Sequence, residues 1–126
     1  MELVTDLNEV YEIVTRPDLF HLVTDCVSVD EYTPNPEGIY FREGDGLVWY
    51  EPHGYTLEMF SAVKNTPKDP VKRVHEHWEV FTHAGYHSVY AIVQKENFKS
   101  AIMCRACGME KFNNEDINVY RKVIYG

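Results

Sequence analysis

The sequence predicts an α/β fold in which one mixed sheet is flanked by helices on both faces. Three observations lead to this prediction: apolar residues at helical spacing near the N-terminus and in the second half, short aromatic and β-branched runs in the middle, and a strongly apolar strand between two later helices. The chain has 126 residues, of which 44% are hydrophobic and 25% charged, an ordinary globular composition. We therefore expect residues 1–126 to form a single domain.

The first 26 residues are predicted to form two short helices. Asp6 and Glu9 have the spacing of a capping box. The apolar residues that follow recur at helical spacing: Leu7, Val10, Tyr11 and Val14. Pro17 suits the first turn of a second helix. Its apolar stripe would consist of Leu19, Leu22, Val23 and Cys26. Residues 27–37, with two prolines and several polar residues, are predicted to be a loop.

The middle of the chain predicts an antiparallel meander of three strands. Residues 38–43 and 47–51 are short β-prone runs separated by Gly44-Asp45-Gly46, which is typical of a hairpin turn. A second turn follows at residues 51–54, and residues 55–63 form a longer strand.

The second half predicts alternating helices and strands. A helix begins with Asp69 as N-cap and Pro70 in its first turn, and ends near Gly85. Residues 86–93 form a buried strand, residues 99–107 a helix closed by Gly108, and residues 117–125 a final strand. The strands at 55–63 and 86–93 are joined through a helix, which predicts a right-handed crossover with parallel pairing.

Charge and composition exclude several classes of partner. The net charge of −8 disfavours nucleic acid, no apolar run approaches the ~20 residues that cross a bilayer, and the N-terminus lacks an apolar signal segment. Three cysteines do not make a disulfide framework. We therefore expect a cytoplasmic protein with neither nucleic acid nor membrane as partner. Residues 1–63 carry a charge of −11 and residues 64–126 carry +3; this asymmetry indicates either two binding faces or chance.

Histidine and cysteine patterns do not predict a metal site. His75 and His77 are two apart on a helix, so their rings point about 200° apart and cannot share an ion. Cys104 and Cys107 form a lone pair, whereas zinc needs about four ligands. His83 and His87 flank the turn at Gly85 and are either surface side chains or a chelating pair.

The segment 97–109 resembles the final helix of the GCN5-related N-acetyltransferase superfamily. The matching positions are Asn97, Ser100, Met103, Cys104, Cys107, Gly108 and Met109. The predicted order of helices and strands is also similar to that family over nearly the whole chain. The resemblance implies a twisted, mostly antiparallel sheet with a central parallel pair of strands, 55–63 and 86–93.

The resemblance also implies a site for acetyl-CoA between those two strands, with its pyrophosphate at the start of the following helix. It carries over Ala62 and Lys64, as the region of a backbone oxyanion donor, and Asn97 and Ser100. The family's glycine-rich loop is missing here, since residues 65–73 contain no glycine. Pro70 removes a donor, and Val71 and Arg73 occupy positions where a side chain would crowd the phosphates. Four basic residues offer side-chain contacts instead, unless they only mark a solvated helix start: Lys64, Lys68, Lys72 and Arg73.

Two residues are candidates for acid–base chemistry. Glu58 lies in the middle of an apolar strand, where the family often places a general base; it is either that base or an outward-facing or paired side chain. Cys104 stands where the family often has a tyrosine that protonates the leaving thiolate. A thiol is able to donate a proton, but a cysteine on an inner helix face is more often packing. The acidic N-terminal half favours a cationic amine acceptor.

The sequence leaves two functions open. The first is an acyl-CoA-dependent N-acyltransferase that moves an acetyl group from acetyl-CoA to an amine. The second is a non-catalytic protein, because the chain is also similar in size to phage head-assembly and internal virion proteins that resemble acetyltransferases but lack the glycine loop. Its partners would then be virion or other proteins, and its location the host cytoplasm or the virion.

Overall fold

The computed structural model describes residues 1–22, 28–112 and 117–125. The elements in chain order are β1 (Glu2–Val4), α1 (Leu7–Val14), α2 (Pro17–Phe20), the 3-10 turn η1 (Val29–Glu31), β2 (Ile39–Glu43), β3 (Gly46–His53), β4 (Thr56–Ala62), α3 (Pro70–His83), β5 (Ser88–Gln94), α4 (Phe98–Ala106), β6 (Glu110–Lys111) and β7 (Ile117–Val123). The strands form a mixed sheet in the order β1-β2-β3-β4-β5-β7-β6.

The chain divides into two compact units, and the boundary between them runs through β3 and through β4. Unit 1 comprises residues 1–51 and 60–68, and unit 2 comprises residues 52–59 and 69–126. The expectation of one domain over residues 1–126 stays a prediction.

Unit 1 contains the predicted hairpin. β2 and β3 pair in antiparallel register from Ile39↔Tyr50 to Glu43↔Gly46, which leaves Gly44 and Asp45 as the turn. Gly44 has a φ of 59°, a conformation that glycine adopts without steric cost. The hairpin prediction is confirmed. The N-terminal strand β1, which pairs with β2, was not predicted, because three residues are too few to show an alternating pattern.

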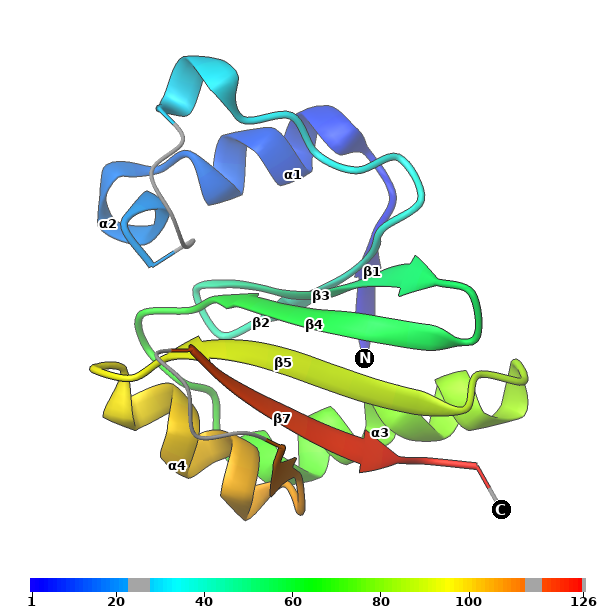
Figure 1. The fold of residues 1–126 in the computed structure, drawn as a ribbon. Coiled ribbons are helices and arrows are strands. Elements are labelled where there is room, and N and C mark those ends of the chain that lie inside the picture. The colour runs from blue at the N-terminus through cyan, green and yellow to red at the C-terminus, as the bar shows by residue number, and fades with distance from the viewer. Residues whose placement is uncertain (23–27, 113–116, 126) are drawn as a thin grey trace. The chain divides into compact units, whose positions relative to one another are not determined.

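The core of unit 1 lies between α1, α2 and the sheet (Figure 1). It consists of Val4, Val10, Ile13, Val14, Leu19, Tyr40, Leu47, Trp49 and Ala62. Neighbouring side chains of β2, Tyr40 and Phe41, are both buried although they point to opposite faces. Both faces of β2 are therefore buried at these two positions.

The N-terminal helices differ in part from the prediction. Asp6 is the N-cap of α1, and its carboxylate accepts a hydrogen bond from the Asn8 N–H at 2.9 Å. Glu9 does not complete the capping box, because its carboxylate pairs with Arg42 on β2. The second helix was predicted too long: α2 ends at Phe20, and Leu22 is exposed. The predicted stripe positions Val23 and Cys26 lie outside the described residues.

Unit 2 is built around β5. This strand runs parallel to β4 from Thr56↔Ser88 to Glu58↔Tyr90, and antiparallel to β7 along its whole length. The predicted parallel pair is confirmed. The two-residue strand β6 beside β7 was not predicted.

The two helices of unit 2 lie on one side of β5 and β7 (Figure 1). The buried residues of α3 are Val74, His77, Trp78 and Phe81. Gly85 and Gly108 follow α3 and α4 with φ values of 95° and 91°, as predicted for helix C-termini. The capping of α3 was predicted wrongly: Asp69 has a left-handed backbone with φ of 54°, and its side chain makes no capping hydrogen bond. Proline at the next position starts the helix instead.

The longest helix in the described ranges has 14 residues, and none of the helices there combines the length and hydrophobicity of a membrane span.

Candidate functional site

Glu58 lies at the end of the parallel ladder in unit 2. The register of β4 with β5 finishes at Glu58↔Tyr90, whereas β5 continues to Gln94 in register with β7. Two residues before Glu58, on the same face of β4, the hydroxyl of Thr56 lies 3.1 Å from the hydroxyl of Ser88 on β5. The ladder thus holds Glu58 on a defined face, next to Tyr90.

The carboxylate of Glu58 is both paired and partly accessible. Its Oε1 accepts a hydrogen bond from the Tyr90 hydroxyl at 3.2 Å and lies 3.4 Å from His53 Nε2. The side chain keeps 18% exposure, while that of His53, the last residue of β3, keeps 55%. Sequence reasoning identified Glu58 but neither partner. A partly accessible carboxylate that is held by a hydroxyl donor and lies beside an imidazole is able to accept a proton from a bound amine.

Cys104 is buried on the inner side of α4. Burial, and to a lesser degree the neighbouring Cys107, raise the pKa of its thiol to about 12. General acids work best when their pKa lies near the working pH, and this thiol is a much weaker acid than that. The environment of Cys104 therefore favours packing, the second of the two interpretations.

Asn97 and Ser100 are brought together at the start of α4. Asn97 is the N-cap of this helix, and its Oδ1 accepts a hydrogen bond from the Ser100 N–H at 3.1 Å. The spacing that resembles the family motif is therefore also the spacing of a helix cap.

The candidate phosphate residues are divided between the two units. Ala62, Lys64 and Lys68 belong to unit 1, whereas Val71, Lys72 and Arg73 belong to the first turn of α3 in unit 2. Val71 and Arg73 are half-buried and Lys72 is exposed. An open groove runs along this end of the helix, lined by Asp69, Pro70, Val71, Lys72, His75, Glu76 and Glu79.

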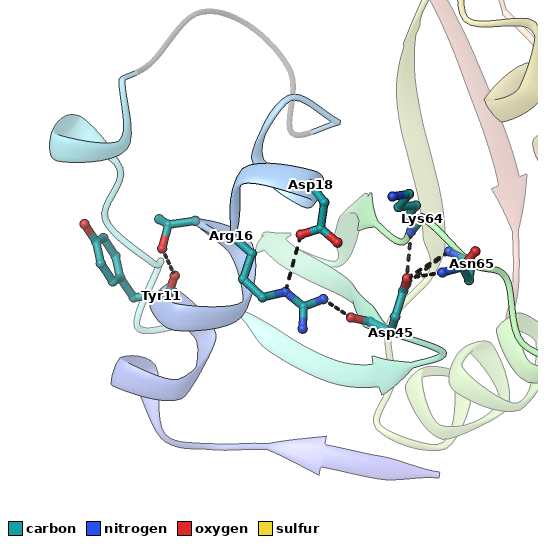
Figure 2. A network of polar contacts seen from close by, with 7 residues as sticks. Tyr11, Arg16, Asp18, Asp45, Lys64 and Asn65 are labelled. Carbon is teal, nitrogen blue, oxygen red and sulfur yellow. Dashed lines mark hydrogen bonds and ion pairs between the residues drawn. The ribbon is translucent and has the colours of Figure 1, made fainter.

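Asp45, in the β2–β3 turn, binds the backbone that follows β4 (Figure 2). Its carboxylate accepts hydrogen bonds from the N–H groups of Lys64, at 3.0 Å, and Asn65, at 3.1 Å, and from the Asn65 side chain at 2.8 Å. The guanidinium of Arg16 donates to the carbonyl oxygen of Asp45. The Lys64 N–H, considered above as an oxyanion donor, is thus occupied by an internal carboxylate. Sequence reasoning placed Asp45 only in a turn, because its partners are about twenty residues away.

The same hydrogen bonds change the acidity of Asp45. Desolvation acts to raise the pKa of Asp45, but the hydrogen bonds from the Asn65 and Lys64 backbone and from the Asn65 side chain outweigh it and hold the pKa below its ordinary value of 3.8. Because the folded-state pKa is lowered, the stabilisation is complete above pH 3.8 and is lost as the pH falls through the lower folded value.

Asp45→Asn should therefore lower the free energy of unfolding at pH 7 and weaken its decline below pH 4, because the variant no longer gains a proton on unfolding there. Denaturant unfolding at pH 7 and between pH 2 and 4 measures both effects. Asp30→Asn, at an exposed position, is the matched control. Parallel pH profiles for Asp45→Asn and the unmodified chain would contradict the prediction.

The histidines of α3 have separate surroundings. His75 is exposed and its Nε2 lies 2.8 Å from the Cys107 carbonyl oxygen, whereas His77 is fully buried. Burial, together with the charge of Arg73, lowers the pKa of His77 to about 4. Among the side chains that the structure describes, no three histidine, cysteine, aspartate or glutamate residues are grouped as metal ligands.

Comparisons with known proteins connect this geometry with one fold. No protein-family model matches the sequence, and neither does any curated protein sequence. Solved structures do match. A Bacillus subtilis acetyltransferase in complex with CoA has a TM-score of 0.67 at 18% identity, over 97% of this chain and 96% of that one. Spermidine N-acetyltransferase from Vibrio cholerae has a TM-score of 0.65 at 12% identity, over 97% and 91%.

The Vibrio cholerae enzyme in complex with CoA and spermine also matches, with a TM-score of 0.58 at 15% identity over 94% of this chain and 86% of that one. At such low identity the likeness shows the fold and not the activity. The shared features include a mixed sheet, a parallel β4–β5 pair and flanking helices. The chain has the fold of the GCN5-related N-acetyltransferase superfamily.

Proposed function

We propose that the chain is an acyl-CoA-dependent N-acyltransferase that transfers an acetyl group from acetyl-CoA to a cationic amine. The observation that carries the proposal is Glu58: a partly exposed carboxylate at the end of the parallel ladder, held by His53 and Tyr90. Solved acetyltransferases with this fold include complexes with CoA and with CoA plus spermine, which supports these substrate classes.

In the proposed reaction Glu58 removes one proton from the ammonium group of the acceptor. The neutral amine nitrogen attacks the thioester carbonyl, the new C–N bond forms and the C–S bond breaks. The nitrogen of the new C–N bond gives up its surplus proton and the departing thiolate takes up one proton, so that the products are a neutral amide and a free thiol. Cys104 is a poor donor for that step because burial raises its pKa to about 12, so water is the better candidate.

The phosphates of CoA would be bound by side chains. Lys72 and Arg73 in the first turn of α3 supply the charge. The preceding loop offers fewer backbone donors, since it lacks glycine and Asp45 occupies the Lys64 and Asn65 N–H groups. Lysine and arginine make charge-assisted hydrogen bonds to phosphate, and these are stronger than neutral ones. Asn97 and Ser100 at the α4 cap complete the proposed binding set of unit 2, and Ala62 and Lys68 of unit 1 are proposed separately.

Acetyl-CoA binding tests this part of the proposal. Calorimetric titration at millimolar acetyl-CoA should give a saturable signal, and the double variant Lys72→Ala/Arg73→Ala should raise Kd about tenfold or more, the usual loss for a charged hydrogen bond. Lys111→Ala, on the exposed strand β6, is the control and should bind like the unmodified chain. If millimolar acetyl-CoA produced neither binding heat nor a shift in Tm, the proposal would be overturned.

The second candidate is a non-catalytic phage head-assembly or virion protein. The loop between β4 and α3 favours it, because this loop has no glycine and its first N–H groups are bound to Asp45. The same titration separates the candidates: a protein that uses the fold only as a scaffold should not bind acetyl-CoA.

A further inference from the structure

The Tyr90 hydroxyl and the His53 imidazole contact the same oxygen atom of Glu58. The Tyr90 hydroxyl and His53 Nε2 lie 3.2 Å and 3.4 Å from Oε1. They come from different strands: Tyr90 is the register partner of Glu58 on β5, and His53 ends β3. The rings of His53 and Tyr90 lie 6.4 Å apart, so the two side chains flank one edge of the carboxylate.

The second oxygen of the Glu58 carboxylate, Oε2, differs from Oε1 in its contacts. Among the hydrogen bonds and ion pairs of the described residues, those of Glu58 are made through Oε1. An ionised carboxylate has about four lone-pair sites on its two oxygens, so an oxygen without a protein donor keeps its full capacity for a ligand. The Glu58 side chain keeps 18% exposure, so part of it is open to solvent or a ligand.

We propose that His53 and Tyr90 are positioning residues that hold Oε1 of Glu58 and present Oε2 to the ammonium group of the acceptor. The inference rests on the proposed function and extends it, because it says which oxygen takes the proton and what fixes its position. The proton moves from the acceptor nitrogen to Oε2, and the nitrogen lone pair then forms the bond to the acetyl carbon. No proton passes through Tyr90 or His53.

We call His53 and Tyr90 together the Glu58 clamp. The clamp works by restricting the side-chain torsions of Glu58. A glutamate has three rotatable bonds, and one contact at Oε1 would still allow the carboxylate to turn about it. Two contacts from separate strands fix the position of Oε1, and the preference of a donor for the plane of the carboxylate limits how far that plane turns. A displacement of about 1 Å in a reacting group costs on the order of a hundredfold in rate, so the clamp should affect kcat.

The test compares variants that remove one donor each. In acetyl-transfer assays with an amine acceptor, Tyr90→Phe and His53→Ala should each lower kcat about 10-fold to 100-fold and leave the KM for acetyl-CoA unchanged. His53→Gln keeps an N–H donor at a similar reach and should recover most of the loss. Tyr55→Phe, which removes an exposed hydroxyl from the turn beside β4, is the matched control. Tm values confirm that each variant is folded.

The outcomes separate the inference from the proposed function. If the unmodified chain binds acetyl-CoA but acetylates no amine, the proposed function falls and the inference falls with it. If it is active and Glu58→Gln abolishes turnover, but Tyr90→Phe and His53→Ala keep full kcat, the inference alone is overturned. If His53→Gln is as slow as His53→Ala, donation to Oε1 is not the role of His53, and the clamp is overturned at that residue.

Discussion

Replacing Glu58 by Gln should lower kcat for acetyl transfer by about 10²-fold to 10⁴-fold, the usual contribution of a general base. Glutamine has the same shape and its carbonyl oxygen still accepts the hydrogen bond from Tyr90, so the fold should be preserved. It is unable to take a proton from an ammonium group at neutral pH. The measurement is steady-state kinetics with saturating acetyl-CoA, together with acetyl-CoA titration of the variant.

Acetyl-CoA should bind the Glu58→Gln variant as tightly as it binds the unmodified chain, because the proposed role of Glu58 concerns the acceptor. Glu110→Gln, on the exposed strand β6, changes the net charge by the same amount and should retain full kcat. A Glu58→Gln variant that keeps kcat within a factor of two would show that Glu58 is not the base.

Gly46→Ala should destabilise unit 1 more than other single-methyl changes, by about 3 kcal/mol or more. An added Cβ at Gly46 would lie 1.8 Å from the carbonyl oxygen of Ala62, at the end of β4. The atom in the way belongs to backbone, so no side chain is able to rotate out of the contact. The measurement is the free energy of unfolding in denaturant.

Gly54→Ala separates this steric effect from the loss of a glycine as such. Gly54 has a positive φ of 66°, but an added Cβ would meet no atom within 4 Å. We expect a cost of about 1 kcal/mol there, since only the backbone conformation is penalised. Equal losses at Gly46 and Gly54 would contradict the steric explanation.

The local features of this fold were predictable because they depend on neighbouring residues. Gly44-Asp45-Gly46 predicted the hairpin, and Pro70 and Gly85 bracketed α3 correctly. The parallel pairing of β4 and β5 followed from the helix between them. The errors lie where the signal is short: the three residues of β1, the two of β6, and the end of α2, where Leu22 continues the apolar spacing but is exposed.

The sequence by itself determined the order of elements, the resemblance to an acetyltransferase fold and one carboxylate, Glu58, that stands out in an apolar strand. Only the tertiary structure decided the partners of that carboxylate, His53 and Tyr90, and the hydrogen bonds of Asp45 to Lys64 and Asn65. The physical reason is the separation along the sequence between the residues that interact. Turns and caps are set by residues a few positions apart, whereas the contacts of Glu58 with Tyr90 and of Asp45 with Lys64 join segments that meet only when the strands pair.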